Sequence, residues 1–161
     1  MNDQTKIKSY GFTLIELLVV IAIVGILSSV VLMNLNGARA RSRDVKRIAD
    51  VKSLQLALEL YFDNNRSYPA TLSVLTAAPT YISPVPTPPE GGSYVYRPIT
   101  IGGTCNSYHL GAVLEQSTSA ELLTDADPPT GSVCSGAADF SGVSTDCGTG
   151  SGAERCFDVA P

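Results

Sequence analysis

The chain has 161 residues, a formal net charge of −4 at pH 7 and 44% hydrophobic residues. This length allows one small domain and a membrane anchor, and excludes two full domains. Residues 63–161 contain ten Asp or Glu against three Arg. Because such a domain repels phosphate groups, we predict no direct binding of nucleic acid.

The chain begins with a short polar segment and a long apolar one. Residues 1–11 are mildly basic, and residues 12–33 form an apolar run with a single charged residue, Glu16. As a helix of about 1.5 Å per residue the run reaches about 33 Å, which spans a bilayer core. A carboxylate at the bilayer centre costs roughly 2.5–3.5 kcal/mol on insertion scales. A plain membrane anchor therefore leaves Glu16 unexplained.

A secretory signal peptide is the second interpretation of this N-terminal segment. Its apolar core is normally about 7–15 residues long. The run here is longer, although Ala38-Arg39-Ala40 resembles a signal cleavage site.

Residues 34–62 are predicted to form an amphipathic helix. Asn34, Asn36 and Gly37 are poor helix formers, so the helix is expected to loosen there. Beyond this junction, apolar residues at helical spacing form two stripes on roughly opposite faces. One stripe is Val51, Leu54, Leu58 and Tyr61, and the other is Val45, Ala49, Leu56 and Leu60. Two stripes favour two partners, the protein's own sheet and a second copy of the chain. A helix that is fully enclosed by its own domain is the alternative.

Residues 63–161 are predicted to form a small globular α+β domain. Its expected elements are a turn at 63–69, a short helix at 70–75, and strands at 93–97, 107–115 and 120–123. The alternation in 107–115 indicates a strand with two distinct faces. The predicted architecture is a long N-terminal helix packed on a small antiparallel sheet, followed by a loop-rich region.

The four cysteines all lie in the distal part of the chain. An even number in a Gly/Ser-rich region favours disulfides formed in an oxidising compartment. Four cysteines allow three connectivities, of which we favour Cys147–Cys156 with Cys105–Cys134. Free buried cysteines are the alternative. A zinc site is poorly supported, because there is no C-x-x-C pair and only one histidine, His109.

The sequence "GFTLIELLVVIAIVGIL" resembles the processing and methylation motif of type IV pilins and type II secretion pseudopilins. The features that match are a basic leader, then Gly11, Phe12, Thr13 and Glu16 in order, then an unbroken apolar run. The following "ARSRDVKRIADVKSLQLALELYFDNNRSYP" is similar to the half-helix and turn of the major pseudopilins. The resemblance covers residues 1 to about 69, and the distal part matches only loosely.

This resemblance implies a processing pathway. A prepilin peptidase is expected to cut between Gly11 and Phe12 and to N-methylate the new amine of Phe12. Thr13 and Glu16 are then the expected assembly residues. A terminal ammonium and a carboxylate attract strongly in low dielectric, but only the paired state offsets their desolvation. Glu16 of one subunit is therefore expected to pair with the amine of a neighbour.

The expected location is the inner membrane, with the C-terminal domain extracytoplasmic, and then a periplasmic pseudopilus or a surface pilus. The basic residues after the apolar run oppose this orientation under the positive-inside rule. The resemblance and the cysteines both support it. The expected partners are further copies of the chain, the peptidase, an inner-membrane assembly platform, and minor pilins or pseudopilins.

The predicted function is that of a non-enzymatic filament subunit, most closely a major pseudopilin. The alternatives are a surface pilin for adhesion, motility or DNA uptake, and a monomeric membrane-anchored binding domain. No cofactor is predicted, although the resemblance allows calcium in the distal loops. The only candidate ligands are loop acids, which are interpreted first as solvated carboxylates: Asp125, Asp127, Asp139 and Asp146. His109 lacks a neighbouring nucleophile and is interpreted as structural.

Overall fold

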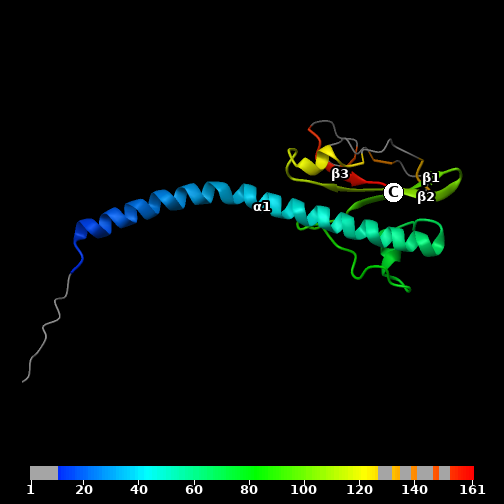
Figure 1. Cartoon of the computed structure of the whole chain (residues 1–161), viewed down its shortest axis with the longest axis horizontal. Helices are drawn as coiled ribbons and strands as arrows, with labels where there is room; N and C mark the ends of the chain where they lie inside the picture. Colours follow the sequence, from blue (N-terminus) through cyan, green and yellow to red (C-terminus); the bar gives the residue numbers. More distant parts are fainter. Residues whose placement is uncertain (1–10, 127–131, 135–138, 141–146, 149–152) are drawn as a thin grey trace, which may run out of the picture. The chain divides into compact units, whose positions relative to one another are not determined.

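The fold is described from a computed structural model. The description covers residues 11–126, 132–134, 139–140, 147–148 and 153–161, apart from the side chains of residues 32–34. The chain divides into two compact units, residues 1–39 and 40–161. The elements follow in the order α1, η1, β1, β2, η2 and β3 (Figure 1).

Helix α1 extends from Leu14 to Asn65, and its C-terminus is fixed by local hydrogen bonds. The side-chain amides of Asn64 and Asn65 donate to carbonyl oxygens four residues earlier. Arg66 then takes a left-handed conformation with φ of 56°, and its amide donates to the Phe62 carbonyl at 2.7 Å. A left-handed residue directly after the last turn is a common way for a helix to end.

The sheet has three antiparallel strands in the order β1-β2-β3. Strand β1 is Val95–Ile101, β2 is Thr104–Val113 and β3 is Cys156–Val159. Gly102 and Gly103 join β1 to β2 and both have positive φ, which glycine adopts without a steric penalty.

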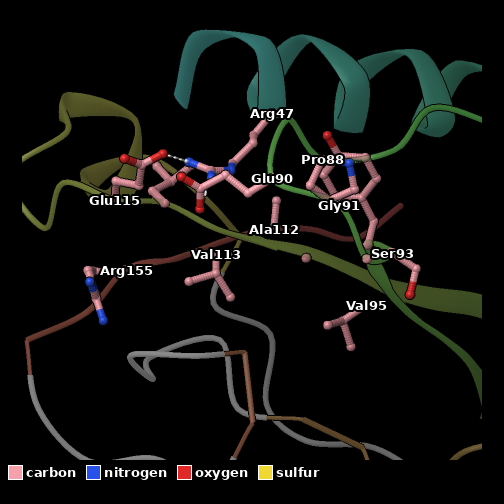
Figure 2. Close-up of a pocket in the computed structure, with 14 residues that line it drawn as sticks. Arg47, Pro88, Glu90, Gly91, Ser93, Val95, Ala112, Val113, Glu115 and Arg155 are labelled. Carbon is pink, nitrogen blue, oxygen red and sulfur yellow. Dashed lines mark hydrogen bonds and ion pairs between the residues drawn. The ribbon is translucent and has the colours of Figure 1, made fainter. Parts of the chain in front are cut away.

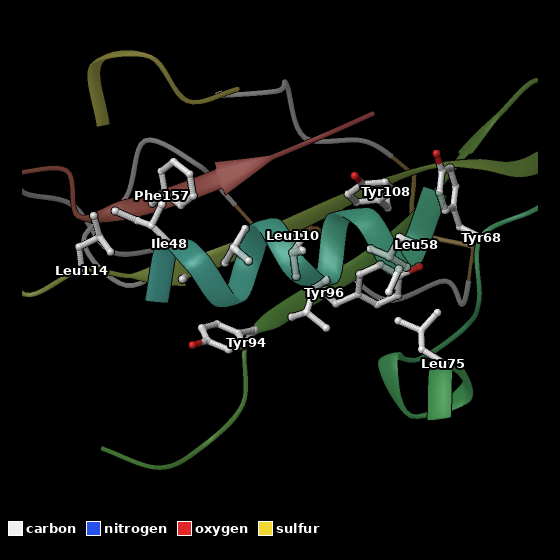
Figure 3. Close-up of a cluster of buried hydrophobic side chains, with 14 of the residues drawn as sticks. Ile48, Leu58, Tyr68, Leu75, Tyr94, Tyr96, Tyr108, Leu110, Leu114 and Phe157 are labelled. Atoms are coloured by element: carbon white, nitrogen blue, oxygen red, sulfur yellow. The ribbon is translucent and has the colours of Figure 1, made fainter. Parts of the chain in front are cut away.

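The main core lies between the sheet and the distal part of α1. Leu54, Leu58 and Leu110 are completely buried there, and the tyrosines of β1 and β2 surround them (Figure 3). Leu75, from the short helix η1 (Leu72–Thr76), closes one end of this core. The predicted inner stripe is therefore confirmed, because it packs on the protein's own sheet.

The second face of the sheet is also covered. Phe140 and the Cys147–Cys156 disulfide pack there, with Val95 beside them. A Cβ added to Gly111 would approach the Phe140 ring to 2.9 Å. The described side chains therefore pack on both faces of the sheet, with the helix on one face and Phe140 and the Cys147–Cys156 disulfide on the other.

Both outer edges of the sheet carry hydrogen bonds to loops of the same chain. Beside β1, the Thr100 amide donates to the Ser132 carbonyl and the Cys134 amide donates to the Pro98 carbonyl. Beside β3, the Ala126 amide donates to the Asp158 carbonyl.

Two expectations about local structure are wrong. Residues 120–123 were expected to form a strand, but Ala120–Leu123 is the 3-10 helix η2. Its residues favour helix over strand, and its hydrogen bonds are local. The third strand is β3 instead. The expected loosening at residues 34–37 is also absent, because α1 continues through them.

Candidate functional site

The segment around the predicted cleavage point lies outside the helix. Gly11, Phe12 and Thr13 precede α1 and have no regular secondary structure. The Phe12 side chain is 83% exposed. The Gly11–Phe12 bond therefore lies before the helix, beside an exposed side chain.

Thr13 and Glu16 form a reciprocal set of hydrogen bonds at the start of α1. Glu16 Oε2 accepts from the Thr13 amide at 3.1 Å and from the Thr13 hydroxyl at 2.8 Å. The Glu16 amide in turn donates to Thr13 Oγ1 at 3.3 Å. This is a capping box, in which the first and fourth residues satisfy each other's unpaired groups. The T-x-x-E pattern before an apolar run is its sequence signature, which the sequence interpretation missed.

The capping box supplies a partner for Glu16 within its own chain. A carboxylate that accepts two hydrogen bonds is less costly in a membrane than a bare one. Thr13 therefore holds the Glu16 carboxylate at the tip of the helix, one turn from Phe12, when no second subunit is present.

The N-terminal part of α1 is mainly apolar and exposed. Apolar side chains from Leu14 to Val31 stay largely uncovered by the chain itself. Among the described residues, α1 is the one helix long and apolar enough to cross a membrane. Its N-terminal part therefore requires lipid or other protein as its surroundings.

The outer stripe of α1, which consists of Val45, Ala49, Leu56 and Leu60, remains uncovered. Val45 is 64% exposed, Leu56 is 63% exposed and Leu60 is 49% exposed. On the inner face, Val51, Leu54 and Leu58 are completely buried. The described part of the domain therefore leaves one apolar side of the helix uncovered.

A cluster of charged residues attaches α1 to the end of β2. Arg47 Nη1 lies 2.6 Å from Asp44 Oδ1 and 2.7 Å from Glu115 Oε1. Arg43 binds the same Glu115 carboxylate through Nε and Nη2. Asp44 also accepts the backbone amides of Glu115 and Gln116. We name Arg43, Asp44, Arg47 and Glu115 the ion cluster.

The ion cluster satisfies charges that would otherwise be costly. Asp44 and Arg47 are 3% and 5% exposed, and buried charges are tolerated only when they are paired. Hydrogen bonds from Arg43, joined by those from Arg47, lower the pKa of Glu115 from 4.5 to about 2, although partial burial opposes the shift. Figure 2 shows Arg47 and Glu115, which bind each other, among the residues that line a pocket.

Two disulfides hold the distal chain. Cys105 is bonded to Cys134, and Cys147 is bonded to Cys156. This is the favoured pairing of the three that the sequence allows. The prediction of a disulfide-stapled C-terminal region is confirmed.

The loop acids are not gathered into a metal site in the described part of the chain. Asp127 and Asp146 lie outside the described residues. Asp139 Oδ1 accepts the Phe140 amide and lies 3.2 Å from the His109 ring. Asp125 accepts the Asp158 amide at 3.3 Å. Within the described ranges no three His, Cys, Asp or Glu side chains are arranged to hold a metal ion.

Comparisons with known proteins agree with these features. Residues 6–32 match the prokaryotic N-terminal methylation motif. The chain is 36% identical over 119 residues to "Type II secretion system core protein G" of Vibrio cholerae, covering 65% of this chain and 82% of that protein. The identically named protein of Escherichia coli K12 is 38% identical over 103 residues, covering 55% of this chain and 71% of the relative.

A third relative of the same name, from Aeromonas hydrophila, is 42% identical over 96 residues, covering 57% of this chain and 66% of the relative. The comparison with solved structures gave no significant match. The motif match at residues 6–32 includes the capping box, and the three relatives share one name. The chain therefore belongs to the family of type II secretion system core protein G, the major pseudopilins.

Proposed function

We propose that this chain is the major structural subunit of a type II secretion pseudopilus and polymerises through α1. The observation that carries the proposal is Glu16, a carboxylate in the first turn of an otherwise apolar, membrane-length helix. Its own chain offers it only the groups of Thr13 among the described contacts. A neighbour's cation would be a stronger partner, because two opposite charges attract each other strongly in surroundings of low dielectric.

We propose that a prepilin peptidase creates this cation. Cleavage between Gly11 and Phe12 and methylation of the new amine place a positive charge at the end of one subunit. Its pairing with Glu16 of the next subunit would favour one axial stagger between parallel helices. The exposed, non-helical position of the Gly11–Phe12 bond supports processing at this point.

We propose that the outer stripe of α1 continues the subunit contact beyond the membrane. The stripe lies on the same helix as the apolar span and is exposed in the single chain. Packing against helices of neighbouring subunits would remove this apolar surface from water, which is favourable at about 25 cal/mol per Å².

The proposed location is the inner membrane, with residues 40–161 on the extracytoplasmic side. Two disulfides support this orientation, since disulfides persist in oxidising compartments. An inner-membrane assembly platform and minor pseudopilins are the further proposed partners. We propose no enzymatic activity. The only histidine, His109, is 1% exposed and enclosed between carboxylates, so it is out of reach of a substrate.

The test compares the wild type with Glu16→Ala and Glu16→Gln in cells that carry a prepilin peptidase and a secretion platform. Intact-mass measurement should show that all three proteins begin at a methylated Phe12. Filament yield after shearing should fall sharply in both variants. A normal filament yield in either variant would refute the proposed role of Glu16, and retention of residues 1–11 would refute the processing step.

A surface pilin is the second candidate, favoured by the disulfide-held cover on the second face of the sheet. A surface that is cross-linked by a disulfide is suited to the oxidising environment outside the cell. Long sheared filaments at native expression, together with unimpaired protein secretion in a deletion strain, would favour the pilus. Loss of secretion without such filaments would favour the pseudopilus.

A further inference from the structure

We propose that Asn65 is an acceptor for N-linked glycosylation, with a lipid-linked oligosaccharide that carries a pyrophosphate leaving group as the donor. Asn65-Arg66-Ser67 has the form Asn-x-Ser, in which the middle residue is not proline. No other asparagine in the sequence has Ser or Thr two positions later. The proposal goes beyond the filament function and rests on it only for the extracytoplasmic location of residues 40–161.

The structure places this motif at an exposed corner of the domain. Asn65 is the last residue of α1, and Arg66 then turns the chain with φ of 56°. Asn65 is itself exposed, and the flanking side chains of Asp63 and Arg66 are 79% and 78% exposed. Because an N-linked sugar is bulky, its acceptor must lie at the surface, in a loop or turn. The end of α1 meets this requirement.

The side-chain amide of Asn65 can be modified without loss of the helix end. Its Nδ2 donates to the Tyr61 carbonyl at 2.9 Å and lies 3.4 Å from the Tyr81 hydroxyl, and both contacts are exposed to solvent. The last turn of a helix opens readily, so a transferase can reach this nitrogen. Nδ2 carries two hydrogens, and glycosylation replaces one of them. The hydrogen that remains can keep the bond to the Tyr61 carbonyl.

The transfer is a substitution at the first sugar of the donor. A bond forms between Asn65 Nδ2 and the anomeric carbon of that sugar. The bond between this carbon and the pyrophosphate oxygen breaks, and the lipid pyrophosphate leaves with the electron pair. One proton of Nδ2 passes to a base of the transferase. The reaction therefore needs no oxidant or reductant.

A sugar on Asn65 is compatible with the proposed contact between subunits. At about 100° per residue, Asn65 lies about 180° around the helix axis from Leu56 and about 140° from Leu60. Both leucines belong to the outer stripe, which is the proposed contact surface. The glycan would therefore project away from the packed side of α1 and remain in solvent.

Asn64 is a matched control for Asn65. It is the adjacent residue, is also exposed, and donates to the carbonyl four residues earlier, that of Leu60, at 3.3 Å. Its Nδ2 likewise lies 3.3 Å from the Tyr81 hydroxyl. The residue two positions after Asn64 is Arg66, so Asn64 lacks the hydroxyl residue of the motif. Modification of Asn65 alone would therefore follow the motif and not exposure.

The test uses the full-length protein, extracted in detergent from the cells that naturally produce it. Its intact mass should exceed that of the methylated, disulfide-bonded chain by whole sugar residues, and fragmentation should place the excess on Asn65. Periodate oxidation followed by a hydrazide dye should label the sugar hydroxyls. Asn64→Gln and Ser67→Thr should keep the excess mass and the label, whereas Asn65→Gln and Ser67→Ala should lose both. Ser67→Ala leaves Asn65 and its hydrogen bonds in place, so a loss there reports the motif and not misfolding.

The same mass spectrum separates this proposal from the filament function. A disulfide-bonded chain that begins at Phe12 and carries no sugar would overturn the glycosylation and leave the filament function intact. Sugar that persists in Asn65→Gln would also overturn the glycosylation of Asn65. A chain that keeps residues 1–11, has free thiols and carries no sugar would overturn both proposals.

Discussion

Leu54 and Leu56 provide a sharp test of the two-sided helix. They are the same residue type two positions apart on α1, yet Leu54 is completely buried and Leu56 is 63% exposed. Leu54→Ala should cost about 2–5 kcal/mol of folding stability, because it removes packed atoms and leaves a cavity. Leu56→Ala should change folding stability by about 0.5 kcal/mol or less, as expected for a surface position.

In filament assembly, by contrast, Leu56 should matter although it contributes little to folding stability. Complete burial of a leucine contributes about 1.5–3 kcal/mol. Since roughly two thirds of the Leu56 side chain remains to be buried, its coverage by a neighbour is worth about 1–2 kcal/mol per subunit. Leu56→Ala should therefore raise the subunit concentration needed for filament growth by about 5- to 30-fold.

The assays are thermal unfolding of the detergent-solubilised subunit and the yield of sheared filaments across a range of expression levels. Leu56→Ser would strengthen the contrast without the charge of a glutamate. The reasoning is refuted if Leu56→Ala destabilises the subunit as much as Leu54→Ala does. It is equally refuted if Leu56→Ala forms filaments at the wild-type concentration.

The remaining predictions concern the distal unit. The pKa of Glu115 is lowered to about 2, so the contribution of Glu115 to folding stability is complete above pH 4.5 and is lost as the pH falls towards 2. Glu115→Gln should therefore lose less stability than the wild type over this pH range. Acid unfolding followed by circular dichroism measures the difference. Gly111→Ala should cost about 1–3 kcal/mol in chemical unfolding, because the added methyl group meets the Phe140 ring at 2.9 Å. Replacement of Cys105 and Cys134 by serine should cost about 3–4 kcal/mol, since the bond closes a loop with a sequence separation of 29.

Each of these predictions has a clear opposing result. An equal acid transition in Glu115→Gln would show that the ion cluster does not set acid stability. Unchanged stability in Gly111→Ala would place Phe140 away from the sheet. Unchanged unfolding of the double serine variant under non-reducing conditions would show that Cys105 and Cys134 are not bonded.

Sequence patterns predicted the elements whose periodicity is long. The inner stripe of α1 and the alternation of β2 each extend over many residues, and both predictions match the structure. The position of β3 could not be predicted, because Cys156–Val159 is four residues long and its strand conformation depends on pairing with β2. Residues 120–123 have a similar length and apolar content, but the backbone hydrogen bonds described for them are local and form a 3-10 helix.

Apart from the disulfide pairing, the contacts of the site leave a local sequence signature only where the partners are close in sequence. Thr13 and Glu16 are three residues apart, so their motif is visible in the sequence. His109 acquires its partners from 30 and 49 residues away, and Glu115 meets Arg47 across 68 residues. Such contacts depend on the folded topology, which a local pattern does not contain.

The outer strands of the sheet are hydrogen-bonded to loops, which affects whether crowded subunits aggregate through their sheets. An open strand edge can recruit a strand from another molecule and lead to uncontrolled aggregation. Here loops of the same chain bind both outer strands, at Thr100 and Pro98 on one side and at Asp158 on the other. Even when many copies are crowded at the membrane, the described sheet can therefore hardly recruit a strand from another copy. Contacts between helices would then be the route to an ordered filament.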